Sequence, residues 1–125
     1  MTKQFEIYKC EICGNIVEVL HEGIGKLVCC GKEMKLQKEN SVDASKEKHV
    51  PIIEKNKEGV KITVGSTPHP MTNEHYIEWI EIYTKKGRAK KFLKPNQEPS
   101  VMFPIKTEIL GARAYCNLHG LWKSK

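Results

Sequence analysis

Metal-binding side chains fall into two sets along this chain of 125 residues. The first set contains four cysteines: Cys10, Cys13, Cys29 and Cys30. The second set contains four histidines and the fifth cysteine: His49, His69, His75, Cys116 and His119. Four thiolates can close a tetrahedral cage, whereas one thiolate with four imidazoles suits a reactive iron better than a structural zinc. Two metal sites of different character indicate redox chemistry.

The four-cysteine set joins an ordinary half to an unusual one. Cys10 and Cys13 have the spacing of a thiolate turn in zinc and rubredoxin-like iron sites, and Gly14 follows them. Cys29 and Cys30 are adjacent, and neighbouring side chains of an extended segment point to opposite sides. Both can reach one metal only if the backbone bends sharply. We expect a closed, distorted site, for which iron and zinc both remain open because both accept four sulfurs.

The second set has more donors than a tetrahedral zinc site needs. A copper electron-transfer site is the nearest alternative, but it uses two histidines and usually a weak axial methionine, and no methionine follows Cys116. Five ligands fit a square pyramid of four imidazoles above one thiolate, which leaves a sixth octahedral position open. A thiolate opposite an open position favours reductive oxygen chemistry at iron. His21, outside both patterns, is interpreted as a surface residue.

Short extended segments are expected to position both sets. In the first 36 residues they span 5–9, 15–20, 26–28 and 34–36 and are separated by glycines. Such a segment is too small to bury a useful core, so a metal must hold it together. A polar stretch begins at Gln37 and predicts a link between a metal module, residues 1–37, and a second domain, residues 38–125.

The second domain reads as a β-sandwich. Segments rich in β-branched and aromatic residues, bounded by Gly and Pro, span 60–64, 76–83, 101–105, 107–110 and 112–116. Several short strands of this spacing predict an antiparallel sandwich. Helical periodicity is not sustained anywhere, and residues 42–47 could form at most one turn of helix. The predicted fold class is therefore all-β.

Composition predicts a cytoplasmic protein. Hydrophobic residues make up 39% and charged residues 29% of the chain, and no apolar run approaches the roughly 18 to 20 residues that span a bilayer. Charged residues near the start leave no room for a signal-peptide core. In a reducing cytoplasm, five cysteines are better explained by metal ligation than by disulfides.

A net charge of +6 favours anionic partners without choosing among nucleic acid, an acidic protein and a small anion. The densest basic stretch, residues 85–94, predicts a solvated hairpin tip, with a docking surface as the alternative. A zinc-ribbon adaptor for nucleic acid is disfavoured because the basic residues lack interleaved aromatics for base stacking. An electron carrier with two saturated metal sites is a further alternative, which azide or cyanide binding would distinguish.

Long motifs in the chain resemble the desulfoferrodoxin family, the two-iron superoxide reductases of anaerobic and microaerophilic prokaryotes. The resemblance covers the full length through residues 8–19, 29–30, 47–51, 69–71, 75, 92–95 and 115–120. It implies a desulforedoxin-like N-terminal module followed by an immunoglobulin-like sandwich that forms a homodimer. It also implies enzymatic detoxification of superoxide under oxidative stress, with electron transport from an external donor.

The resemblance assigns a role to each donor. Cys10, Cys13, Cys29 and Cys30 would hold a distorted rubredoxin-type iron. The four histidines, His49, His69, His75 and His119, would hold a catalytic ferrous iron in one plane, with Cys116 axial. The cofactors would be two iron ions per chain, Fe(Cys)4 and Fe(His)4(Cys). Superoxide would bind the open position, take one electron and two protons, and leave as hydrogen peroxide, and rubredoxin would re-reduce the iron.

Three further positions near the reactive iron carry expectations. Glu47 and Lys48 immediately precede the ligand His49 and so must lie near the open face. The resemblance implies that Glu47 can close the sixth position of the oxidised iron and that Lys48 attracts superoxide and helps to deliver a proton. Ala114 stands where the family often has glutamate, a difference that would alter local charge near the axial thiolate without removing a ligand.

Overall fold

The computed structural model describes residues 1–43 and 48–124, and these residues form thirteen strands and no helix. The predicted all-β class is confirmed. Val42 and Asp43 are not helical, and the rest of the suggested helical turn lies outside the described residues. No helix in the described ranges is long and apolar enough to cross a membrane. The chain divides into two compact units, Met1–Lys38 and Glu39–Lys125.

The first unit consists of two small sheets. Strands β1 (Ile7–Lys9), β2 (Ile16–Glu18) and β5 (Lys35–Leu36) pair in the order β2-β1-β5, and β3 (Val28–Cys29) forms a hairpin with β4 (Lys32–Glu33). Each of the four predicted segments contains or overlaps one of these strands, whereas β4 was not expected. The buried apolar side chains of this unit are Ile7, Cys10 and Val19. So small a core is consistent with a unit that a metal holds together.

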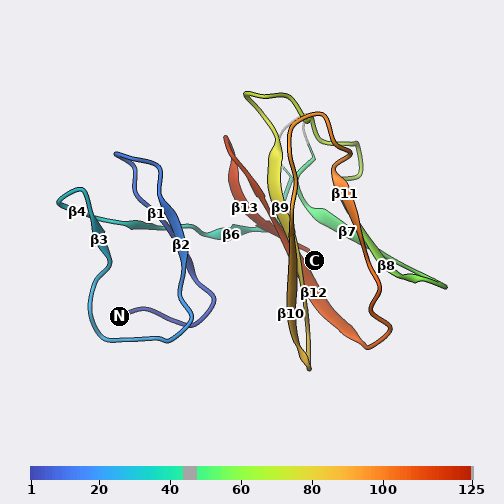
Figure 1. Ribbon diagram of the computed structural model, residues 1–125, viewed down its shortest axis with the longest axis horizontal. Helices are drawn as coiled ribbons and strands as arrows, with labels where there is room; N and C mark the ends of the chain where they lie inside the picture. Colours follow the sequence, from blue (N-terminus) through green and yellow to red (C-terminus); the bar gives the residue numbers. More distant parts are fainter. Residues whose placement is uncertain (44–47, 125) are drawn as a thin grey trace. The chain divides into compact units, whose positions relative to one another are not determined.

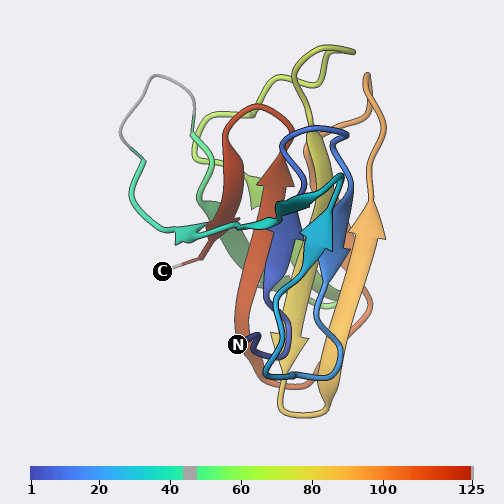
Figure 2. The same cartoon turned by 90° about the vertical axis from the view of Figure 1, so that its left-hand side faces the viewer.

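The second unit is built from two sheets (Figure 1). The larger sheet has the order β10-β9-β12-β13-β6, with β6 at Glu39–Asn40, β9 at Ile77–Thr84, β10 at Gly87–Phe92, β12 at Ile109–Cys116 and β13 at Gly120–Lys123. The smaller sheet has the order β11-β8-β7, with β7 at Pro51–Asn56, β8 at Gly59–Val64 and β11 at Ser100–Phe103. Figure 2 shows the long strands β9, β10 and β12 side by side, in yellow to orange. All pairings are antiparallel except that of β13 with the short β6.

Alternate side chains of both sheets form the core. Ile80 and Ile82 of β9 join a buried cluster with apolar residues of β8, β11 and β12. Because successive side chains of a strand point to opposite faces, the intervening Glu81 lies on the other face of the larger sheet. Both sheets contribute side chains to one apolar cluster between them, which is the arrangement of a β-sandwich, as predicted.

Two details differ from the expected strand pattern. The segments predicted at 107–110 and 112–116 form one strand, β12, with a register shift between Ile109 and Gly111. At that shift a side chain on residue 111 would come within 2.6 Å of the Tyr83 hydroxyl, so any larger residue would displace the Tyr83 ring. Strands β6, β7 and β13 were missed because charged residues and short length hide their alternation, and β6 lies in the polar stretch predicted as a link.

The basic stretch is mostly not a hairpin tip, which corrects the prediction. Only Lys85 and Lys86 occupy the turn, and residues 87–92 form β10, paired with β9 along its length. Arg88 Nη1 lies 3.1 Å from Glu81 Oε1, and Lys90 Nζ lies 3.5 Å from Glu81 Oε2. These two cations therefore neutralise a carboxylate of the same sheet rather than forming a purely solvated surface.

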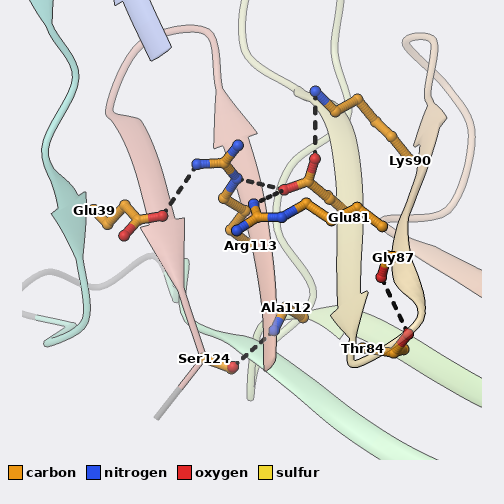
Figure 3. A network of polar contacts seen from close by, with 9 residues as sticks. Glu39, Glu81, Thr84, Gly87, Lys90, Ala112, Arg113 and Ser124 are labelled. Atoms are coloured by element: carbon orange, nitrogen blue, oxygen red, sulfur yellow. Dashed lines mark hydrogen bonds and ion pairs between the residues drawn. The ribbon is translucent and has the colours of Figure 1, made fainter. Parts of the chain in front are cut away.

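A buried ion network extends from Glu81 to the edge of the sheet (Figure 3). Arg113 of β12 is 2% exposed and donates from Nε to Glu81 Oε1. Its Nη1 also donates to Glu39 Oε2 at 3.1 Å. Because β13 lies between β12 and β6, this arginine spans a neighbouring strand and ties β6 to the centre of the sheet.

Candidate metal centres

The first pair of cysteines lies on one tight turn. Gly14 donates its N–H to the Cys10 carbonyl at 2.9 Å, and Cys10 donates its own N–H to the Asn15 carbonyl at 2.8 Å. Gly14 has a φ of +86°, a conformation that glycine adopts without steric cost. The turn brings the Cys13 N–H to 3.5 Å from Cys10 Sγ. The backbone thus stabilises negative charge on this sulfur.

The second pair owes its geometry to the hairpin between β3 and β4. Cys30 and Gly31 form the loop and have φ values of +55° and +74°. Positive φ at both central residues is the requirement of the type I′ turn, and it is uncommon for a residue other than glycine. With Cys30 in this conformation, its Sγ lies 3.9 Å from Cys29 Sγ. The sharp bend predicted from the adjacent cysteines is confirmed.

The four sulfurs converge on one point. Their Sγ atoms all lie within 4.8 Å of one another. The hydrogen bond from the Cys13 N–H lowers the pKa of Cys10 to about 6, whereas hydrogen bonding with the Cys13 thiol raises the pKa of Cys30 to about 12. Four thiols so close cannot all ionise without a cation among them. The donor set fits a tetrahedral thiolate-bound metal.

The second site is a closed ring of imidazoles. His49 neighbours His69, with 4.7 Å between ring centroids, and His69 neighbours His75 at 4.7 Å. His75 then neighbours His119 at 5.0 Å, and His119 returns to His49 at 4.9 Å. All four contacts are edge-on, with interplanar angles of 62° to 84°. Each ring therefore has two neighbours, which is the order expected of four equatorial ligands.

The fifth donor lies beneath the ring in the sandwich core. Cys116 is fully buried, and its Sγ lies 3.8 Å from His119 Nδ1. One ligating atom from each of the five residues lies within 4.8 Å of all the others, and we call this set the five-donor site. His49 and His69 are buried, whereas His119 is exposed, so the site has an inner and an outer side. This set of four nitrogens and one sulfur fits iron, and its outer side is accessible from solvent.

Three different loops deliver the histidines. His49 precedes β7, and its N–H is 2.6 Å from Asp43 Oδ1. His69 follows β8, and its N–H donates to the Val64 carbonyl at 2.9 Å. Its Nδ1 lies 2.7 Å from the Pro70 carbonyl oxygen. Because a carbonyl can only accept, the ring proton is on Nδ1, and the lone pair of Nε2 is left available to bind a metal.

The turn between β12 and β13 delivers both Cys116 and His119. Asn117, in this turn, accepts the Tyr76 N–H on Oδ1 at 2.9 Å and donates Nδ2 to the Glu74 carbonyl at 3.0 Å. Because Glu74 and Tyr76 flank His75, one amide holds the C-terminal turn against the loop of a third ligand. This connection accounts for the position of His119 next to His75 in the ring.

Lys48 and Glu47 are the two residues predicted to govern the open face, and the structure describes Lys48. Lys48 is half-buried, and its backbone lies against Gly65 at the end of β8. A side chain on residue 65 would come within 2.8 Å of the Lys48 carbonyl oxygen, so this approach requires glycine. Glu47 lies outside the described residues. Ala114 is 1% exposed and belongs to the apolar core cluster, on the same strand as Cys116.

Sequence reasoning missed three residues that hold ligands or the loops that carry them. They are Asp43 and Asn117, described above, and Trp122, whose indole stacks on the His49 ring at 4.6 Å between centroids. Asp43 and Asn117 carried no signal because short polar residues are common in loops for many reasons. Trp122 offered a weak one, since it follows the ligand His119 by three residues.

Comparisons with known proteins agree with this geometry. Residues 2–37 match the N-terminal domain of desulfoferrodoxin, and residues 41–125 match the desulfoferrodoxin family. A desulfoferrodoxin of Nitratidesulfovibrio vulgaris is 58% identical over 125 residues, which cover 100% of this chain and 99% of that protein. A superoxide reductase of Pyrococcus horikoshii is 40% identical over 104 residues, covering 68% of this chain and 90% of that protein.

A solved structure extends the comparison to the fold. The superoxide reductase from Treponema pallidum superposes with a TM-score of 0.82 at 31% identity, covering 99% of this chain and 100% of that one. The two donor sets, four cysteines in one and four histidines with a cysteine in the other, match those of the two-iron members. The predicted cofactors, two iron ions per chain, are thereby confirmed. This chain belongs to the desulfoferrodoxin family.

Proposed function

We propose that this protein is a superoxide reductase, which converts superoxide to hydrogen peroxide by one-electron reduction. The observation that carries the proposal is the convergence of four imidazoles and one thiolate within 4.8 Å, with His119 on a solvent-exposed side. Iron held by these donors would supply the electron that reduces superoxide. Relatives named superoxide reductase in Pyrococcus horikoshii and Treponema pallidum support the same activity.

The chain's own residues have separable roles in this chemistry. We propose that His49, His69, His75 and His119 would hold the iron together with Cys116, the donor on the core side of the site. Burial of Cys116 excludes water from its sulfur, which keeps the thiolate a strong electron donor. The hydrogen bond between His69 Nδ1 and the Pro70 carbonyl holds one ring in the ligating tautomer.

Lys48 and Glu47 are proposed to act at the open face. Lys48 directly precedes a ligand, so its cation lies close to the site that superoxide must reach. Salt screens charges that lie farther away than the Debye length, about 8 Å at physiological salt, so this nearby cation attracts the anion more strongly than distant ones do. It also helps to bring a proton to the departing peroxide through ordered water. Glu47, one residue further from His49, is proposed to close the site after turnover, a role supported by its sequence position and family membership.

An external donor must restore the electron. We propose that a one-electron carrier such as rubredoxin does this, as family membership supports. Family membership likewise supports two further proposals, that the protein forms a homodimer and that it is located in the cytoplasm. We further propose that Cys10, Cys13, Cys29 and Cys30 hold the rubredoxin-type iron. Exposure of Cys13 and Cys30 would let a small redox protein approach that site.

Metal content, spectra and product stoichiometry together test the proposal. The purified protein should contain two irons per chain, as its two donor sets require, and azide should change the spectrum of the oxidised five-donor site. Superoxide generated by pulse radiolysis should yield one hydrogen peroxide per superoxide and no dioxygen. His75→Ala should abolish this reaction, whereas His21→Ala, at a histidine outside the ring, should not. Zinc in both sites, or peroxide at half that yield with dioxygen, would refute the function.

A further inference from the structure

Trp122 of β13 contacts two of the ring histidines through different groups. Its indole stacks on the His49 imidazole with 4.6 Å between centroids and 15° between planes. Its Nε1 donates to the His119 carbonyl oxygen at 3.1 Å. His49 and His119 are separated by 70 residues, and His49 Nε2 lies 3.2 Å from His119 Nδ1. One side chain thus contacts both sides of the point where the ring closes.

We infer that Trp122 is a positioning residue that fixes the His49 ring plane and the His119 turn for metal binding. The inference deepens the proposed function and rests on iron being held at the five-donor site. It does not require that the iron reduce superoxide, because the contacts concern ligand geometry alone. Trp122 is not itself placed against substrate.

The orientation of His49 needs such a contact. Rotation of an imidazole about its bond to Cβ meets only broad, shallow preferences, so its plane must be set by its surroundings. Asp43 accepts the backbone N–H of His49, a bond that does not itself orient the ring. A nearly parallel indole restricts the turn, since rotation of the imidazole would lose the stacked surface.

The His119 turn benefits from the hydrogen bond in a different way. His119 is exposed, and Gly120 follows it with a φ of +87°, so a tight turn on the solvent side carries this ligand. The indole N–H anchors the carbonyl of His119 to a residue three positions later. Trp122 is itself paired with Ala114 on one side and Asn40 on the other. The turn is therefore anchored to an interior strand of the sheet.

Two variants separate stacking from hydrogen bonding. Trp122→Phe retains an aromatic face but loses the donor, and Trp122→Leu loses both. Trp79→Phe is the matched control because Trp79 Nε1 has no hydrogen-bond partner among the described residues, and its ring stacks on Tyr115 instead. The assay follows loss of iron from the five-donor site of the full chain to a ferrous chelator, without superoxide.

Expected release rates follow from the lost contacts. A hydrogen bond contributes about 1 kcal/mol, so Trp122→Phe should release this iron about fivefold faster. Because Trp122→Leu also loses the aromatic contact, it should release this iron about 30-fold faster than the wild type. The thiolate-to-iron absorption band of the oxidised protein should also shift in both variants, which a role confined to fold stability would not produce. Trp79→Phe should leave the rate and the band unchanged.

The inference is overturned if Trp122→Phe, with an unchanged circular dichroism spectrum, keeps the wild-type release rate and band. It is equally overturned if Trp79→Phe releases iron as fast as Trp122→Phe. Should Trp122→Leu fail to fold, Trp122→Phe against Trp79→Phe still decides. A wild-type protein that holds iron but does not reduce superoxide would refute the proposed activity while leaving this comparison valid.

Discussion

Replacing Glu81 by glutamine tests whether the buried ion network stabilises the sandwich. Glu81 is 2% exposed and its carboxylate interacts with Arg88, Lys90 and Arg113. Arg88 and Lys90, whose side chains are 27% and 21% exposed, can turn toward water when the charge is removed. Arg113, at 2% exposure, cannot, and it keeps a half-exposed Glu39 as a counter-ion.

The magnitude follows from this difference in exposure. Removing one partner of a buried pair costs about 3–5 kcal/mol because the other charge is left buried. Since two of the three cations can reach solvent, we expect the lower end, about 3 kcal/mol of unfolding free energy. For a domain of this size each kcal/mol shifts the melting temperature by about 4–8 °C, so the unit should melt about 12–24 °C lower.

Denaturant unfolding of the iron-loaded chain, followed by tryptophan fluorescence, measures this loss. Both tryptophans belong to the second unit, so the signal reports the sandwich alone. Glu108→Gln is the matched control, because Glu108 pairs with Lys85 at 3.7 Å on the surface and the pair should contribute about 0–1 kcal/mol. A second change, Arg113→Met in the Glu81→Gln background, should recover part of the stability because it removes the stranded charge.

Two results would refute this reasoning. One is a loss below about 1 kcal/mol for Glu81→Gln, the range of an exposed pair. The other is a double variant less stable than Glu81→Gln, since removal of the buried cation would then have no benefit. Either result would mean that the carboxylate is hydrated in solution despite its burial.

Four other perturbations have expected outcomes. Lys48→Ile should slow superoxide capture about tenfold in pulse radiolysis, whereas neutralising Lys85 and Lys86 together should change it less; equal losses would contradict local steering. Gly65→Ala should also slow capture, because its new methyl group would meet the Lys48 carbonyl at 2.8 Å, and an unchanged rate would show that the loop adapts. Asp43→Ala should lower the free energy of unfolding in urea by about 2 kcal/mol, and Asp43→Asn by less, because the Asp43 carboxylate accepts the N–H groups of His49 and Val50. Removing the iron of the four-cysteine site should expose residues 1–38 to limited proteolysis while the sandwich keeps its β signal, and joint unfolding of both units would contradict this independence.

The sequence predicted the donor sets well because metal ligation leaves a chemical signature that does not depend on the fold. Cys29 and Cys30 even indicated a sharp bend, which the positive φ of Cys30 confirms. Strands were legible where β-branched and aromatic residues are concentrated, as in β9. No such enrichment marks β10, where Arg88, Lys90 and Lys91 lie in a regular strand at the sheet edge and the first two pair with Glu81.

The contacts that hold the ligands could not be predicted in the same way. Trp122, Asn117 and Asp43 each act through a few contacts with backbone or ring atoms of other segments. Such contacts leave no period in the sequence, since they depend on which loops the sandwich brings together. The same holds for Arg113, whose position between apolar residues of β12 suggests an ordinary outward-facing charge.

The closed order of the imidazole ring has a consequence for folding. The rings of His49, His69 and His75 follow one another in the order of the chain. The ring closes, however, through the contact of His49 with His119, which are 70 positions apart. Contacts of such separation form late because the intervening chain must lose its freedom first. A complete iron site can therefore exist only after the C-terminal hairpin has docked. The colour of that iron should serve as a kinetic marker for completion of the sandwich, appearing after the bulk of the β signal.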